Sequence, residues 1–209
     1  MRSEYITIHI HHGDLPSNLS FEGDIAIDTE TTGLNLSRDR LCVIQLSAGD
    51  GDAHLVQFSK GEYNATNLRK VLTNKNITKI FHFARFDVAA IYKYLNVQIE
   101  NIYCTKIASK IARTYTDTHG LKDLCRDLLD LAISKQQQSS YWGHGKLSKE
   151  QVDYAATDVL HLHKLRDILN TMLAKEGRAE LAEQCFSFIN LRVKLDLAVW
   201  NDVDIFAHK

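Results

Sequence analysis

Three apolar runs follow one another at short spacing in the first third of the chain, and this spacing limits the possible folds more than any other feature. The runs cover residues 25–30, 41–47 and 53–58. Turn-forming segments at 35–39 and 49–52 separate them, and connections this short join antiparallel neighbours. From residue 77 onward, apolar strands alternate with helical segments, which favours crossover connections and parallel pairing. We therefore predict an α/β fold: a mixed sheet, an antiparallel meander plus parallel strands, flanked by helices.

The other elements follow from the same periodicities. Alternation of apolar and polar residues predicts a half-exposed strand over 5–11. Further elements are predicted in this order: a helix over 67–72, a strand over 77–83, a helix over 87–95, a strand over 99–104, and helices over 106–113 and around 121–128. Ser148 and Gln151 form a capping box, so a long helix is expected from Lys149 to about Lys175. A last helix is expected to run from Ala179 to about Trp200, which makes the C-terminal part helical.

Charge and cysteine usage restrict the function. Lys and Arg total 25 against 26 Asp and Glu, giving a net charge of −1, so bulk positive charge cannot drive binding to long nucleic acid. An anionic substrate must instead be held by local cations or by bound metal. The 4 cysteines form no CxxC pair, and the N-terminus lacks the apolar run of a secretory signal. We expect reduced thiols in a cytoplasmic protein with no membrane partner.

Two acids at the end of the first apolar run are the first candidate site. Asp28 and Glu30 are two residues apart, so in a strand both carboxylates point to the same side. Carboxylates this close repel each other and raise a pKa unless a cation lies between them. Hard divalent cations prefer such oxygen ligands. The alternative is a strand end that carries two solvated acids.

Two later motifs add acids to the set. Asp87 follows an apolar strand at the start of a helix, where the helix dipole favours a carboxylate and simple capping is a sufficient alternative. Tyr154 and Asp158 are four residues apart and share one helix face, with small residues between them that permit close approach to a sheet. Four carboxylates from three elements fit two divalent ions that catalyse in-line attack on a phosphodiester. A tyrosine hydroxyl at such a site can orient the attacking water.

The order of these motifs resembles a known superfamily. DxE, then HxAxFD, then YxxxD is similar to the three motifs of the DEDD 3′–5′ exonucleases, in their tyrosine-bearing branch. The run 146–158 and the pattern Lys135-x-Gln137-x-x-Ser140-x-Trp142 resemble ribonuclease D. The resemblance covers residues 20–170. It implies a ribonuclease H-like fold, two Mg²⁺ or Mn²⁺ ions, release of nucleoside 5′-monophosphates from a free 3′ end, and catalytic roles for Asp28, Glu30, Asp87, Tyr154 and Asp158. All of these except Tyr154 would be metal ligands.

Departures from ribonuclease D narrow the resemblance. Ribonuclease D enzymes carry C-terminal helical nucleic-acid-binding domains, whereas this sequence ends at Lys209, and Phe83 stands where many members have Asn. The compact length and near-neutral charge most resemble the nanoRNase C group. That group implies short single-stranded RNA, down to dinucleotides, as substrate and a homo-oligomeric ring, such as an octamer. Alternatives are ribonuclease D-like trimming of tRNA or structured RNA, a DNA 3′–5′ exonuclease, and a catalytically silent RNA-binding module.

The resemblance also suggests organisation and substrate contacts. We expect one exonuclease domain over 1–209, with a catalytic core over 20–175 and a C-terminal helix over 178–200. A stripe on that helix packs on the core or contacts another subunit; its residues are Leu181, Cys185, Phe188 and Ile189. The backbone of Thr31 and Thr32 is expected to contact the 3′ nucleotide, and Leu34 to wedge against its base, unless Leu34 belongs to the core.

Other groups near the motifs are candidates for binding substrate. His82 and Phe83 precede Asp87 and are expected to line a base pocket, with Phe83 as a core residue as the alternative. Trp142 and His144 lie in a glycine-flanked loop just before the third motif, which is expected to lie near the substrate and to meet a 5′ phosphate. Lys106 begins a basic stripe that either binds phosphates or is a solvated helix face; its other members are Lys110 and Arg113.

A histidine cluster near the N-terminus is separate from these motifs. His9, His11 and His12 are close enough in sequence to bind a transition metal. With no cysteine or further histidine nearby in the sequence, we interpret them as the polar face and end of the first strand.

Overall fold

The computed structural model describes residues 6–134, 136–200 and 203–208. The strands are β1 (Thr7–His12), β2 (Ile25–Thr31), β3 (Leu41–Ser47), β4 (Asp52–Gln57), β5 (Lys79–Phe81) and β6 (Ile102–Cys104). The helices are α1 (Thr66–Thr73), α2 (Ala84–Leu95), α3 (Thr105–Ala112), α4 (Leu121–Leu129), α5 (Lys149–Leu160), α6 (Leu162–Lys175) and α7 (Ala179–Leu195), which continues into a short π-helix, η1 (Asp196–Trp200). Three residues used above, Tyr5 at the start of the predicted first strand, Lys135 and Lys209, lie outside the described residues.

The strands form one mixed sheet in the order β1-β4-β3-β2-β5-β6. β2, β3 and β4 are antiparallel neighbours, which confirms the predicted meander. β5 pairs in parallel with β2, and β6 with β5. β1 lies at the other edge of the sheet and pairs in parallel with β4. The spacing of the strands in the sequence did not indicate this partner. The predicted α/β class with a mixed sheet and a helical C-terminal part is confirmed.

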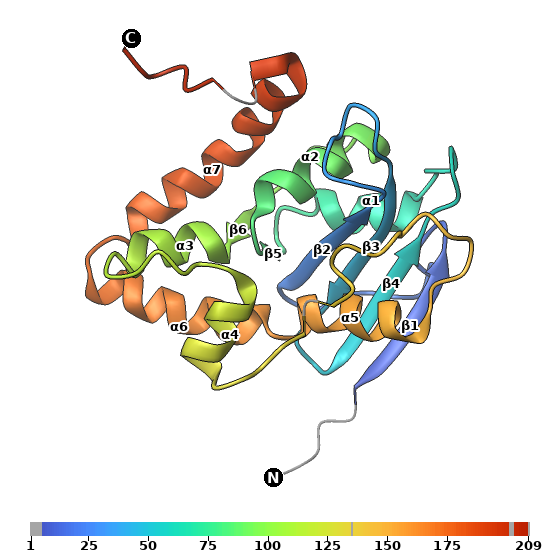
Figure 1. The fold of residues 1–209 in the computed structure, drawn as a ribbon, viewed down its shortest axis with the longest axis horizontal. Coiled ribbons are helices and arrows are strands. Elements are labelled where there is room, and N and C mark those ends of the chain that lie inside the picture. Colours follow the sequence, from blue (N-terminus) through green and yellow to red (C-terminus); the bar gives the residue numbers. More distant parts are fainter. Residues whose placement is uncertain (1–5, 135, 201–202, 209) are drawn as a thin grey trace.

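The two faces of the sheet are covered by different helices. α5 crosses one face over β2, β3 and β4, while α1 and α2 lie behind the sheet in Figure 1. β3 lies in the centre of the meander, and all of its residues are buried. In register, Asp28 lies opposite Gln45, and Gln45 opposite Leu55, so the acids of β2 point to the face covered by α5.

The expected helix from Lys149 to Lys175 is wrong as a single element. α5 ends at Leu160 and α6 begins at Leu162, with His161 between them. The two helices pack on different partners: α5 lies on the sheet, and α6 on α3 and α4. The break lies where the main packing partner changes, and local periodicity carries no signal for such a change. The capping box of Ser148 and Gln151 is present as predicted.

The junction between β5 and α2 also differs from the prediction. The strand ends at Phe81 and the helix begins at Ala84, because Phe83 adopts a left-handed conformation with φ 67°. A residue in this conformation continues neither a strand nor a helix. The junction therefore occupies only two residues, and Asp87 lies in the first turn of α2.

The C-terminal helix packs on the core through a stripe that shares only Ile189 with the one predicted. Its buried residues are Ala182, Phe186, Ile189 and Val193. Leu181 is exposed, while Cys185 and Phe188 are half-buried. The other cysteines are buried, and all 4 are free thiols, as expected. Across the described residues, no helix has the length and apolar character needed to span a membrane.

Candidate active site

Three of the predicted acids meet where β2 faces α5. One carboxylate oxygen from each of Asp28, Glu30 and Asp158 can be chosen so that all lie within 4.8 Å of one another. Strand alternation places the first two side by side, and α5 brings the third. Ala155 and Ala156 are fully buried and allow α5 to lie close against the sheet. The register of β2 with β3 shifts between Glu30 and Thr31, so the strand bends directly after the acids.

The fourth acid, Asp87, comes from the helix on the other face of the sheet and is only 4% exposed. Thr29 lies between the two acids of β2, and its Oγ1 donates a hydrogen bond of 2.7 Å to Asp87 Oδ1. The hydroxyl links α2 to the strand that carries the acids. We predicted no role for Thr29, but strand alternation places it on the face opposite Asp28, and this was a signal that it lies toward α2.

Burial and mutual repulsion make this cluster electrostatically unfavourable. Burial first, and then the neighbouring carboxylates, raise the pKa values of Asp28 and Glu30 well above their usual range. Burial raises the pKa of Asp87 to about 7, against the hydrogen bond from Thr29, which lowers it. A divalent cation relieves this repulsion, and oxygen donors suit Mg²⁺ and Mn²⁺. The chemistry of these carboxylates therefore fits a site for divalent metal ions, as predicted.

Gln45 also contacts the acids. It lies opposite Asp28 in register, and its Nε2 is 3.5 Å from Asp28 Oδ2, a long hydrogen bond. The buried Oε1 of the same amide has no hydrogen-bond partner among the described residues. Gln45 was not predicted as a site residue, although a polar residue inside the otherwise apolar run 41–46 is a signal for such a role.

Tyr154 lies one helical turn before Asp158. Burial and the negative charge of Asp158 raise the pKa of the Tyr154 phenol. The hydroxyl is therefore protonated at neutral pH and can donate a hydrogen bond, but it cannot serve as a base.

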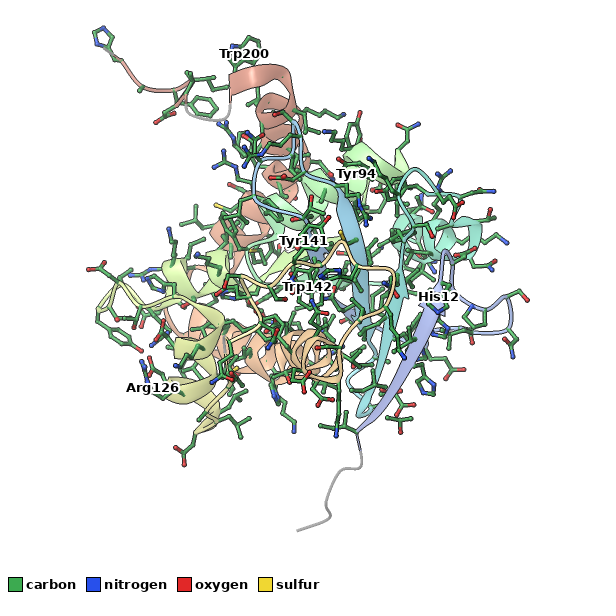
Figure 2. The ribbon with its side chains drawn as sticks, turned by 45° about the vertical axis from the view of Figure 1, so that its right-hand side comes forward. His12, Tyr94, Arg126, Tyr141, Trp142 and Trp200 are labelled. Carbon is green, nitrogen blue, oxygen red and sulfur yellow. The ribbon has the colours of Figure 1, made fainter. Side chains whose placement is uncertain are left out.

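Trp142 does not lie where a substrate contact was expected. Only 2% of it is exposed, and its ring centroid is 6.1 Å from that of Tyr154. A buried indole presents no face to a nucleotide. Figure 2 shows Trp142 among the side chains inside the molecule, while its neighbour Tyr141 is exposed. Trp142 packs beside Tyr154 and limits how that ring can move.

The turn after the acids is held by its own side chains. Thr31 Oγ1 donates to the carbonyl of Gly33 at 2.6 Å, and Thr32 Oγ1 accepts from the backbone N–H of Arg40 at 3.0 Å. A Cβ at Gly33 would lie 2.5 Å from the Asp39 carboxylate, so a larger residue here would displace that side chain. Leu34 at its tip is 85% exposed, which excludes the core alternative. The turn thus presents backbone and one apolar side chain to solvent.

The second motif contributes a similar exposed group. Phe83 is 45% exposed and therefore not a core residue, and Lys106 Nζ lies 4.6 Å from the centre of its ring. His82 is half-buried, and its Nδ1 is 2.9 Å from Thr105 Oγ1. Phe83 and Lys106 form an aromatic and cationic surface at the start of α2 and α3.

The proposed basic stripe on α3 does not exist as a surface. Arg113 is buried, and its guanidinium pairs with Asp127 at 2.7 Å and donates to the carbonyl of Thr118 at 3.1 Å. These bonds hold the segment between α3 and α4. Lys110 remains exposed and Lys106 packs on Phe83. The expectation that Arg113 shares an exposed face with the lysines was therefore wrong.

The loop before α5 is tied to the sheet through its backbone. Arg40 donates to the carbonyl of Gly143 at 3.0 Å, and Gln57 Nε2 donates to the carbonyl of His144 at 3.0 Å. The His144 ring is exposed and meets Tyr141 edge-on, with centroids 4.9 Å apart. Arg40 and Gln57 were missed because their partners are backbone atoms about a hundred residues away.

Comparison with known proteins agrees with this geometry. A family model described as 3′–5′ exonuclease matches residues 4–174. The chain belongs to the 3′–5′ exonuclease family. Ribonuclease D from Gluconacetobacter diazotrophicus is 30% identical to this exonuclease over 87% of this chain and 43% of its own length. The chain spans less than half the length of the curated ribonuclease D relatives that it matches.

Two solved structures match this exonuclease over nearly the whole chain. Brucella melitensis NrnC bound to pGG is 51% identical, with a TM-score of 0.94 and coverage of 98% of this chain and 100% of that one. NrnC with bound Mg²⁺ is 50% identical, with a TM-score of 0.93 and coverage of 98% and 100%. The predicted resemblance to ribonuclease D and to the nanoRNase C group is confirmed, as is the enzyme class at the level of the family.

Proposed function

We propose that this exonuclease hydrolyses short oligoribonucleotides from the 3′ end and releases nucleoside 5′-monophosphates. The observation that carries the proposal is the group of Asp28, Glu30 and Asp158 carboxylates within 4.8 Å of one another. Such a set suits divalent cations, and phosphodiester hydrolysis is the chemistry that paired cations promote at carboxylate sites. The family membership supports the direction of attack, and the pGG bound to NrnC supports a short substrate.

The chain's own residues would divide the work as follows. Asp28, Glu30 and Asp158 would bind two Mg²⁺ or Mn²⁺ ions directly, and buried Asp87 would complete the acidic set. The bound ions would supply positive charge for the attacking and leaving oxygens. Tyr154 would donate its hydroxyl to position the water, because its raised pKa keeps the proton on the phenol.

The substrate would be gripped by its last nucleotide. The backbone of Thr31 and Thr32 would contact the 3′ nucleotide, and exposed Leu34 would wedge against its base. Phe83 would offer a stacking face, with His82 beside it and Lys106 placed to meet phosphate. His144, exposed in the loop before α5, would lie toward a 5′ phosphate. These contacts suit a few nucleotides better than a long strand, because the net charge of −1 provides no excess of positive charge for a long one.

A length series tests the proposal. RNAs from dinucleotides upward, labelled at the 5′ end, are incubated with the full chain and Mg²⁺, beside DNA of the same sequences. We expect mononucleotide release, fastest on the shortest RNAs and abolished by EDTA. Preference for structured RNA would favour ribonuclease D-like trimming, and equal rates on DNA a DNA exonuclease. Binding without hydrolysis would indicate a silent RNA-binding module.

We also propose that the chain assembles as a homo-oligomer, with a ring such as an octamer as the expected form. Support comes from exposed apolar residues on α7 and the segment after it; they are Leu181, Leu191, Trp200 and Phe206. Figure 2 shows Trp200 at the end of the molecule away from His12 and β1. Light scattering after gel filtration should give a mass several times that of the chain, reduced by Leu191→Glu but not by Glu183→Gln. A monomeric wild-type protein would contradict this.

A further inference from the structure

Three imidazoles meet on the face of the sheet opposite Asp28 and Glu30. His9 and His11 are two residues apart on β1, so they share a face, and His54 on β4 lies opposite His9 in register. The ring centroids of His9 and His54 are 4.7 Å apart, and those of His11 and His54 5.4 Å. The proposed nuclease chemistry uses none of them.

The spacing of two ring nitrogens matches that of ligands on one ion. His11 Nε2 lies 3.1 Å from His54 Nδ1. Two imidazole nitrogens bound to one tetrahedral Zn²⁺, each at its usual bond length, are about 3.3 Å apart. The rings of His11 and His54 are nearly parallel, with an interplanar angle of 13°. These two side chains therefore already have the separation that a shared ion requires.

The third imidazole is oriented by a carboxylate. His9 Nε2 lies 3.5 Å from Asp52 Oδ2, which leaves Nδ1 as the nitrogen for a metal. Histidines that bind zinc commonly donate their other ring N–H to a carboxylate, which fixes the ring orientation and makes the ligand more basic. Asp52 is thus placed to accept the Nε2–H of His9, as a carboxylate does behind a zinc-binding histidine.

The protonation state suits metal binding. Burial and the neighbouring imidazoles lower the pKa values of His11 and His54, while Asp50 and Asp52 oppose this at His54. Both rings are therefore neutral at pH 7, and the neutral imidazole is the form that binds metal. His9 and His11 are half-buried, so an ion can reach the cluster from solvent.

We propose that His9 Nδ1, His11 Nε2 and His54 Nδ1 bind one Zn²⁺ ion, with water as the fourth ligand. Rotation of the half-buried His9 ring brings its Nδ1 to the ion and completes the set. The ion cross-links the edge strand β1 to β4. It differs from the proposed ions at Asp28 and Glu30 both in its ligands, which are nitrogens, and in its position on the other face of the sheet. Imidazole nitrogens suit Zn²⁺ far better than Mg²⁺, whereas the oxygen ligands of the carboxylate cluster suit Mg²⁺.

Neighbouring His12 provides a matched control. It follows His11 on β1, but strand alternation points it to the other face, and it is exposed. A variant at His12 removes a histidine from the same strand without touching the proposed ligands.

Calorimetric titration of the full chain with Zn²⁺, in excess Mg²⁺ to saturate the carboxylates, tests the proposal. We expect one site per chain, weakened about tenfold or more by His9→Ala and by His11→Ala, and unchanged in His12→Ala. Co²⁺ bound in place of Zn²⁺ should give the visible absorption of a tetrahedral site in wild type and lose it in His11→Ala. Zn²⁺ should also raise the Tm of wild type but not of His11→Ala.

Other outcomes would overturn the proposal. Zn²⁺ affinity that is the same in wild type, His9→Ala and His11→Ala would place the ion elsewhere, as would equal loss in His12→Ala. Loss of the site in Asp28→Asn would assign the zinc to the carboxylates. Circular dichroism of each variant shows whether it is folded; if His11→Ala is not, His11→Gln replaces it in the same comparison.

Discussion

The carboxylate cluster and the imidazole cluster use the same sheet in the same way and reach opposite electrostatic results. In each, two residues at i and i+2 on a strand point to one side, and a further ligand arrives from a neighbouring element. Burial and their mutual repulsion raise the pKa values of Asp28 and Glu30, whereas burial and the neighbouring imidazoles lower those of His11 and His54. Burial therefore opposes the charged, metal-binding form of the acids, whereas at His11 and His54 it favours the neutral, metal-binding form.

This difference shows that strand geometry gathers ligands but the side-chain type decides what they hold. Burying the carboxylates without a cation is unfavourable, so metal binding at the active site should stabilise the folded protein. The imidazoles are satisfied without one, because His11 and His54 bond to each other. We expect the first cluster to be essential for activity and the second to be independent of it.

The largest effect is expected from Asp158→Asn. Losing one carboxylate of the group should lower kcat by on the order of a thousandfold or more, because residues that act as a unit fail together. Zn²⁺ binding at the imidazoles should be unchanged. Steady-state rates on a dinucleotide and calorimetry measure the two. Asp153→Asn, an exposed acid on the same helix, is the control, and equal loss in both variants would contradict the assignment.

Tyr154→Phe should have the next largest effect. Removing the hydroxyl should lower kcat by on the order of a hundredfold, with KM nearly unchanged, because the phenol positions water rather than substrate. Single-turnover rates and binding to the Asp28→Asn background separate chemistry from affinity. A rise in KM alone would show that the hydroxyl binds substrate instead.

Asp87→Asn should stabilise the metal-free protein. A pKa near 7 in the fold, above its ordinary value of 3.8, means that the folded state holds the extra proton between these pH values. Its contribution to stability is full below about pH 4 and is lost as pH rises toward 7, at about 1.4 kcal/mol per unit of pKa difference. The amide can still accept from Thr29. We expect the free energy of unfolding of the variant to be on the order of 2 kcal/mol higher at pH 8 in EDTA, measured by urea unfolding. This is less than the full pKa difference of Asp87, because the neighbouring acids contribute to the unfavourable burial.

Two comparisons sharpen that test. Mg²⁺ should shrink the difference, and the difference should vanish below pH 4. His54 should behave with the opposite sign: its pKa is lowered from 6.5, so its contribution to stability is lost as pH falls below that value. An Asp87→Asn variant less stable than wild type at pH 8 would contradict this prediction. It would show that the contacts of the Asp87 carboxylate stabilise the fold by more than its burial destabilises it.

The smallest effect is expected at Phe83. Its left-handed backbone costs about 1–2 kcal/mol in an ordinary residue, and Asn adopts it more readily. Phe83→Asn should raise stability by about 1 kcal/mol while weakening affinity for dinucleotide by a few-fold, as the stacking face is lost. Thermal unfolding and fluorescence titration measure these. Phe83→Ala controls for the ring, and unchanged affinity in both variants would remove Phe83 from the binding surface.

Much of this architecture is readable from the sequence, because it depends on local periodicity. Strand alternation places Asp28 beside Glu30, helical spacing places Tyr154 with Asp158, and short turns give the meander. What failed depended on distant partners. The break at His161 follows from a change of packing partner, and the burial of Arg113 from an ion pair with Asp127 across a loop. His54 lies 43 residues from His11, so the third imidazole was invisible until β1 paired with β4.

Arg40 has a consequence for engineering. Its guanidinium joins three backbone carbonyls, those of Leu41, Phe58 and Gly143, and its own backbone N–H holds Thr32. Arg40 therefore holds both the turn that presents Leu34 and the loop that leads into α5. Grafting either loop from a relative would leave the other mismatched, so the two segments must be exchanged together, with the arginine, if specificity is to be transplanted.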